Sequence, residues 1–218
     1  MTHAPLIALI DGPLAADTPG LSARTDACAL HLRAAESPAA LHAAHMAAAI
    51  RANAPAARFL GISIFPGSLS TSLATAAEAL YRAAESEAEI VHCSFGHTSA
   101  SHLLTEAVTA VLAAGKLLTA SAPARGAPVY PAACEQVFSV QGDARCTPAQ
   151  WSRLDLPGAR FGACAGSPGA AVRGASLAAA HFTGLLAHAC MNGGVERMLR
   201  APSFTGRERI VPGGPQAA

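Results

Sequence analysis

The sequence of 218 residues contains no apolar run that approaches the roughly 20 residues of a membrane-spanning helix. Its N-terminus lacks the basic residues that begin a secretory signal peptide, and Asp11 follows only a short apolar stretch. Its 15 Lys and Arg residues are balanced by 14 Asp and Glu residues, so no excess of positive charge would attract nucleic acid or an anionic membrane. We therefore expect a cytoplasmic protein that binds neither nucleic acid nor membrane.

Closely spaced cysteine pairs are also missing. The sequence has no C-x-x-C motif, and the familiar spacings of zinc ligands do not occur. Without a secretory signal, we expect the cysteines to be reduced and mostly buried as small apolar side chains, with a redox or zinc role as the alternative. There are six: Cys28, Cys93, Cys134, Cys146, Cys164 and Cys190.

Charged residues are scarce at 13%, whereas 51% of the residues are apolar, which is typical of a globular chain with a large core. A chain of this length fits one domain, which we expect over residues 1–200. Residues 201–218 are rich in proline and glycine. They are predicted to form a C-terminal tail that is partly disordered.

Strand-like and helix-like segments alternate along the chain, which is typical of a parallel α/β sheet with helices on both faces. Ser37 and Pro38 supply an N-cap and a first-turn proline for one of the helices, and Gly115 is placed to end another. The segment 122–133, with three prolines, is predicted to be an active-site loop. The predicted strands are 6–10, 58–64, 89–94, 116–121 and 136–141, and the predicted helices are 38–53, 70–86, 99–114 and 175–190.

Three short segments each present one member of an Asp-His-Ser charge-relay system. Asp11 ends the first apolar strand, His42 lies near the start of one predicted helix, and Ser176 lies at the start of another. A serine hydroxyl needs a base to become a nucleophile, so His42 would take the proton of Ser176 and Asp11 would orient the imidazole. The order Asp, His, Ser along the chain is that of subtilisin-type enzymes.

Each of these residues alone has a simpler interpretation. Asp11 could be the first polar residue of a turn, and Ser176 could be a small residue at a tight helix crossing. His42 and His45 could be two surface residues or a weak metal pair. The order and the flanking sequences of the three residues favour the charge relay. We expect His45 and His181 to be structural histidines that pack under the site.

The sequences around the three residues resemble those of the subtilisin-like serine protease family. Residues 7–11 match the family's apolar strand that ends in the catalytic Asp. Residues 42–48 read H-A-A-H-M-A-A, which is similar to the family's H-G-T-H-V-A-G. Residues 174–184 read G-A-S-L-A-A-A-H-F-T-G, which is similar to G-T-S-M-A-S-P-H-V-A-G. The resemblance covers about residues 5–190 and implies a three-layer α/β/α fold with a mostly parallel central sheet.

The resemblance also implies where a substrate binds. Residues 89–96 read E-I-V-H-C-S-F-G, which is similar to the D-V-I-N-M-S-L-G strand that lines the family's substrate cleft. Ser94, Phe95 and Gly96 would then offer backbone groups to an extended peptide. His97 stands where the family usually has a small residue, and could narrow or polarise the first specificity pocket.

One loop departs from the family pattern. Residues 115–126 read G-K-L-L-T-A-S-A-P-A-R-G, which is similar to G-V-V-V-V-A-A-A-G-N-E-G and places Ala122 beside the substrate. Ala124 stands where the family has the side-chain amide that completes the oxyanion hole. Loss of that donor in subtilisin itself costs about 10²–10³ in kcat. The backbone N–H of Ser176, at a helix N-terminus, would be one donor, and Arg125 or a water would supply another.

These residues together predict a serine endopeptidase that cleaves a peptide or protein bound in extended form. We expect no cofactor, and no structural calcium or other metal, because the family's long calcium loops have no room here. The short chain and the weakened oxyanion hole favour a processing enzyme, most similar to the small subtilases that remove leader peptides. Two alternatives stay open: a peptide acyl transferase or cyclase that uses the same three residues, and a pseudo-protease that binds a peptide without cleaving it.

Overall fold

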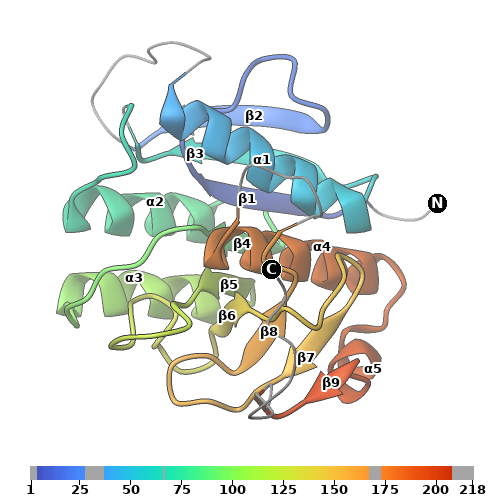
Figure 1. Ribbon diagram of the computed structural model, residues 1–218. Helices are drawn as coiled ribbons and strands as arrows, with labels where there is room; N and C mark the ends of the chain where they lie inside the picture. Colours follow the sequence, from blue (N-terminus) through green and yellow to red (C-terminus); the bar gives the residue numbers. More distant parts are fainter. Residues whose placement is uncertain (1–3, 28–36, 66, 167–172, 208–218) are drawn as a thin grey trace.

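The computed structural model describes residues 4–27, 37–65, 67–166 and 173–207. Within these residues, nine strands form one sheet in the order β2-β3-β1-β4-β5-β6-β8-β7-β9 (Figure 1). The strands are β1 Leu6–Asp11, β2 Leu21–Asp26, β3 Arg58–Ser63, β4 Ile90–Cys93, β5 Leu117–Ser121, β6 Phe138–Gly142, β7 Trp151–Arg153, β8 Phe161–Ala163 and β9 Phe204–Thr205.

Most neighbouring strands of the sheet are parallel. Every adjacent pair from β2 to β8 runs parallel, β7 is antiparallel to β8, and β9 is parallel to β7. Parallel neighbours require crossover connections, which the helices supply. The predicted mostly parallel central sheet is therefore confirmed.

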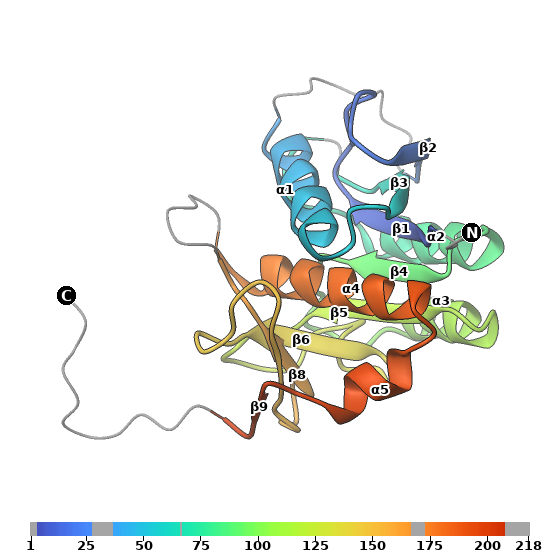
Figure 2. The same cartoon turned by 90° about the vertical axis from the view of Figure 1, so that its right-hand side faces the viewer.

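Helices cover both faces of the sheet and produce three layers (Figure 2). The side chains of β1 alternate between these faces, as a strand requires. Ile7 and Leu9 pack with α1 and α4, whereas Ala8 and Ile10 pack with α2 and α3. Among the helices in the described part of the chain, none combines the length and apolar character needed to cross a bilayer. The helices are α1 Pro38–Asn53, α2 Leu73–Glu85, α3 His102–Ala113, α4 Ala175–Met191 and α5 Val195–Arg200.

Serine caps fix where α1 and α2 begin. The Ser37 hydroxyl accepts the N–H of Ala40 at 3.1 Å, and Pro38 occupies the first turn of α1. The Ser72 hydroxyl accepts the N–H of Thr75 at 3.1 Å in the same way. The cap at residue 37 sets the entry of the helix that carries His42.

The predicted helices and strands agree with the structure in segments that have a long run of apolar residues. The helix over 38–53 is confirmed at both ends, whereas α2 and α3 begin three residues later than predicted. The strands β2, β7 and β8 and the helix α5 were not predicted. β2 is a largely exposed edge strand with a polar sequence, and β7 and β8 have only three residues each, too few to show a period.

Part of the predicted tail belongs to the sheet. β9 pairs with β7, and the N–H of Ser203 donates to the Trp151 carbonyl at 2.9 Å. Residues 208–218 lie outside the described residues. The partial disorder of the tail and the domain boundary at residue 200 therefore stay predictions.

The helices α1 and α4 cross closely at Gly184. A methyl group added there would lie 2.4 Å from the Ile50 carbonyl oxygen and 3.0 Å from Cβ of Asn53. We expect Gly184→Ala to lower the free energy of unfolding by about 1–3 kcal/mol, because the two helices would have to separate. Urea unfolding measures this. At Gly158 nothing lies within 4 Å of such a methyl group, so Gly158→Ala should change stability by no more than about 0.5 kcal/mol. Equal unfolding midpoints for the two variants would contradict the close crossing.

Candidate active site

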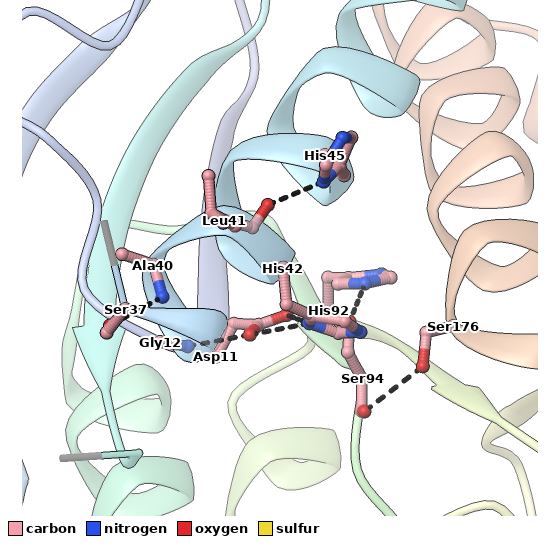
Figure 3. Close-up of polar contacts among 10 residues, drawn as sticks. All are labelled: Asp11, Gly12, Ser37, Ala40, Leu41, His42, His45, His92, Ser94 and Ser176. Carbon is pink, nitrogen blue, oxygen red and sulfur yellow. Dashed lines mark hydrogen bonds and ion pairs between the residues drawn. The ribbon is translucent and has the colours of Figure 1, made fainter. Parts of the chain in front are cut away.

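A buried carboxylate and an imidazole meet at the carboxyl end of β1. Asp11 is the last residue of β1 and is fully buried, and His42 lies in the second turn of α1. Both carboxylate oxygens of Asp11 lie 2.9 Å from Nδ1 of His42 (Figure 3). Because an ionised carboxylate only accepts hydrogen bonds, His42 donates through Nδ1–H, which leaves Nε2 of the neutral ring as an acceptor. The arrangement presents a base with its free nitrogen directed away from Asp11.

Gly12 makes this meeting possible. Its N–H donates to Oδ1 of Asp11 at 2.6 Å and so satisfies part of the buried carboxylate. A Cβ atom at this position would lie 2.1 Å from the carbonyl oxygen of Ala39, in the first turn of α1. The absence of a side chain therefore lets α1 approach β1 closely enough for His42 to reach Asp11.

The environment of His42 favours its protonated form. Burial lowers the pKa of His42, but its hydrogen bond to Asp11 and the charge of the Asp11 carboxylate together raise the pKa above its ordinary value. Such a pair stabilises the imidazolium that forms when His42 accepts a proton.

Ser176 lies at the opposite side of the site, at the start of α4. It is the second residue of that helix, and Gly174 at the N-cap has φ of 143°, which a glycine adopts without strain. The Ser176 hydroxyl donates to the carbonyl oxygen of Ser94 at 3.3 Å (Figure 3). First-turn N–H groups have no partner within their own helix, so the N–H of Ser176 is available to an anion.

His42 and Ser176 line one cavity of about 350 Å³. Four predicted substrate-binding residues, Ser94, Phe95, Gly96 and His97, line the same cavity. The structure therefore brings together residues that lie more than 130 positions apart in the sequence.

The loop residues predicted to complete the site do not line this first cavity. Ala124 is exposed and lines a second cavity, of about 530 Å³, together with Gly174 and Ala175. Arg125 is exposed, and its guanidinium has neither a hydrogen bond nor an ion pair to any other described residue. Ala122 is fully buried, and its N–H donates to the Val140 carbonyl at 2.8 Å. Ser176 thus lines the first cavity, and the two residues before it line the second.

Part of the wall of the first cavity was not predicted. Phe65, residues 69–73, before and at the start of α2, and Leu104 of α3 line it together with His42 and Ser176. No sequence pattern marks these residues as neighbours of the site, because only the packing of α2 and α3 on one face of the sheet brings them there. Leu69 of this wall is half exposed.

A second imidazole lies beneath the site. His92 of β4 is fully buried, and its Nε2 lies 2.6 Å from the hydroxyl oxygen of Ser94 (Figure 3). Its Nδ1 lies 2.8 Å from the hydroxyl oxygen of Thr183 in α4. His92 was not among the predicted site residues.

The other two histidines that the sequence singled out are placed differently from each other. His181 is buried as predicted, and burial lowers its pKa. His45 is exposed and its Nδ1 lies 2.7 Å from the Leu41 carbonyl oxygen, so the prediction that it packs under the site is wrong. Within the described ranges, no group of three or more His, Cys, Asp or Glu side chains is placed to hold a metal ion.

Comparison with known proteins relates the chain to two protease structures. No family model matches the sequence, and no curated protein matches it. A mutant of the protease domain of PatA matches with a TM-score of 0.65 and 20% identity, over 87% of this chain and 82% of that chain. The prenylagaramide maturation protease PagA matches with a TM-score of 0.62 and 20% identity, over 87% of this chain and 77% of that chain. The chain therefore has the α/β fold of subtilisin-like proteases, as its motifs predict.

Proposed function

We propose that this protein is a serine endopeptidase that cleaves a specific peptide or protein, removing a leader segment during maturation. The observation that carries the proposal is the pairing of Asp11 with Nδ1 of His42 at 2.9 Å, in a cavity that His42 shares with Ser176. The structural likeness to the protease domain of PatA and to the maturation protease PagA supports it. The finer proposal is that the chain resembles the leader-peptide protease of quinohemoprotein amine dehydrogenase biogenesis, another compact subtilase.

The chemistry would proceed by acyl transfer to Ser176. Nε2 of His42 accepts the hydroxyl proton as Ser176 attacks the carbonyl carbon of the scissile bond, and Asp11 stabilises the resulting imidazolium. His42 then protonates the leaving amine. Water hydrolyses the acyl-enzyme, with His42 again as base. The N–H of Ser176 and the positive end of α4 stabilise the oxyanion in both steps.

An extended peptide would cross Ser176 with side chains in both cavities. The first cavity combines the polar groups of the reaction with apolar walls from Phe65, Leu69 and Leu104, so it suits an apolar side chain of the substrate. The Ser94 carbonyl accepts the Ser176 hydroxyl in this structure. A backbone N–H of the peptide would compete for the same carbonyl and release the hydroxyl toward His42. The nucleophile is then freed by the substrate itself.

A second candidate is a pseudo-protease that binds a peptide without cleaving it. Two observations favour it: the Ser176 hydroxyl is engaged by Ser94, and Ala124 lacks the amide that would complete an oxyanion hole. An acyl transferase or cyclase on the same residues shares the first half of the mechanism and differs only in the nucleophile that receives the acyl group.

A fluorophosphonate probe tests whether Ser176 is activated. We expect intact-mass spectrometry to show one phosphonyl group on the wild type, and labelling at least about 10³-fold slower for Ser176→Ala and His42→Ala, because each variant removes the nucleophile or its base. His45→Ala is the matched control on the same helix face, and should label like the wild type. A folded wild type that does not label while still binding peptides would support the pseudo-protease instead.

Product analysis separates hydrolysis from ligation. Hydrolysis of a leader-containing peptide gives two products whose summed mass exceeds that of the substrate by one water. Transfer or cyclisation joins the acyl group to an amine and adds no water to the total. We expect the first pattern, and products without the added water would assign the acyl transferase instead.

The pKa of His42 tests the Asp11 pair directly. In the wild type we expect the His42 ring to titrate above its ordinary value of about 6.5, because Asp11 outweighs the effect of burial. In Asp11→Asn only burial acts, so the pKa should fall below that value and hydrolysis should slow by about 10³–10⁴. NMR of the ring C–H protons measures both proteins. An unchanged pKa would show that Asp11 does not govern His42.

A further inference from the structure

Two departures from the family motifs meet in the structure. In the stretch similar to D-V-I-N-M-S-L-G, His92 stands where the motif has Asn, and in the stretch similar to S-P-H-V-A-G, Thr183 stands where the motif has Ala. These residues are 91 positions apart, yet Nδ1 of His92 lies 2.8 Å from the hydroxyl oxygen of Thr183. The imidazole that differs from one motif therefore contacts the hydroxyl group that differs from the other.

We assign the protons of this cluster from the one partner that can only accept, the Ala179 carbonyl. The Thr183 hydroxyl donates its single proton to the Ala179 carbonyl at 2.8 Å, one turn earlier in α4. It can only accept from His92, so His92 carries its proton on Nδ1. Nε2 of the neutral ring is then an acceptor, and the Ser94 hydroxyl donates to it at 2.6 Å.

The ring of His92 stays neutral. Burial, and after it the charge of His42, lowers the pKa of His92 to about 3. A neutral ring keeps the hydrogen-bond directions fixed at any pH at which His42 titrates. It also places no second positive charge beside the His42 imidazolium.

The cluster links α4, which carries Ser176, to Ser94 just after β4. Thr183 and Ser176 both belong to α4, and Ser94 directly follows β4, which carries His92. The carbonyl of the same Ser94 accepts the Ser176 hydroxyl at 3.3 Å (Figure 3). His92 therefore links the middle of α4, at Thr183, to Ser94 just after β4 through two hydrogen bonds.

We propose that His92 is a positioning residue. Its hydrogen bonds to Thr183 and to Ser94 fix the Ser94 backbone relative to Ser176, so that a peptide substrate is placed correctly for the reaction. The inference rests on the proposed function. His92 is fully buried and its two ring nitrogens are engaged by Thr183 and Ser94, so its effect on catalysis passes through Ser94.

Two variants of Thr183 test this role. Thr183→Val keeps the shape of the side chain but removes the acceptor for Nδ1–H, whereas Thr183→Ser retains it. With a peptide substrate we expect Thr183→Val to lower kcat about tenfold with KM changed less than about twofold, because a peptide that the Ser94 backbone holds out of line with Ser176 slows the chemical step more than it weakens binding. Thr183→Ser should keep kcat within about threefold of the wild type. Circular dichroism melting shows that both variants are folded.

Two further measurements separate positioning from general packing. Ring ¹⁵N NMR should show the Nδ1–H tautomer of His92 in the wild type and in Thr183→Ser, and its loss in Thr183→Val. Ser94→Ala breaks the same path at its other end, so combining it with Thr183→Val should lower kcat little more than either change alone.

The possible results distinguish failure of the positioning role from failure of the proposed function. Equal kcat for the Val and Ser variants, full additivity with Ser94→Ala, or an Nε2–H tautomer in the wild type would each overturn the positioning role while leaving Ser176 active. A wild type that hydrolyses nothing and does not label with the phosphonate would overturn the proposed function, and the positioning role with it.

Discussion

The buried carboxylate of Asp11 is the group on which the rest of the site depends. A fully buried charge is stable only when hydrogen bonds or an opposite charge compensate it, and here the N–H of Gly12 and the ring of His42 do so. Both contacts require α1 to pass close to the end of β1, where Gly12 leaves room for Ala39. The Ser37 cap and this close approach together fix the position of His42. The hydrogen bond that stabilises the Asp11 carboxylate therefore also orients His42 as the base.

The pKa values of the two histidines at the site, His42 and His92, are shifted in opposite directions. His42 is paired with a carboxylate and has a raised pKa, so it can accept a proton during the reaction. His92 is hydrogen-bonded to two hydroxyl groups and has a lowered pKa, so it serves as a fixed hydrogen-bonding link. The helix α4 contributes to both parts of the site, since Ser176 lies in its first turn and Thr183 two turns later. Parallel strands and helix N-termini converge at one edge of the sheet, which is why this edge carries the reactive groups.

Much of this could be predicted from the sequence, for physical reasons that differ between elements. The helix over 38–53 has its cap and proline signal next to each other, and β1 is a continuous apolar run, so both were predicted correctly. β2, β7 and β8 are short or polar and gain their stability from neighbours in the sheet. In the site, the motif order pointed to Asp11, His42 and Ser176. The wall from residues 69–73 and the link from His92 to Thr183 exist only through packing, although the two motif departures were visible in the sequence.

In the proposed mechanism, His42 and Ser176 act together on a bound peptide. A crystal structure of the protein with a peptide aldehyde tests it most directly, because the aldehyde forms a tetrahedral adduct with an activated serine. We expect a covalent bond from Oγ of Ser176 to the aldehyde carbon, with Nε2 of His42 within hydrogen-bonding distance of the adduct and a peptide N–H donating to the Ser94 carbonyl. A bound peptide with no covalent bond, and with the Ser176 hydroxyl still donating to Ser94, would contradict it.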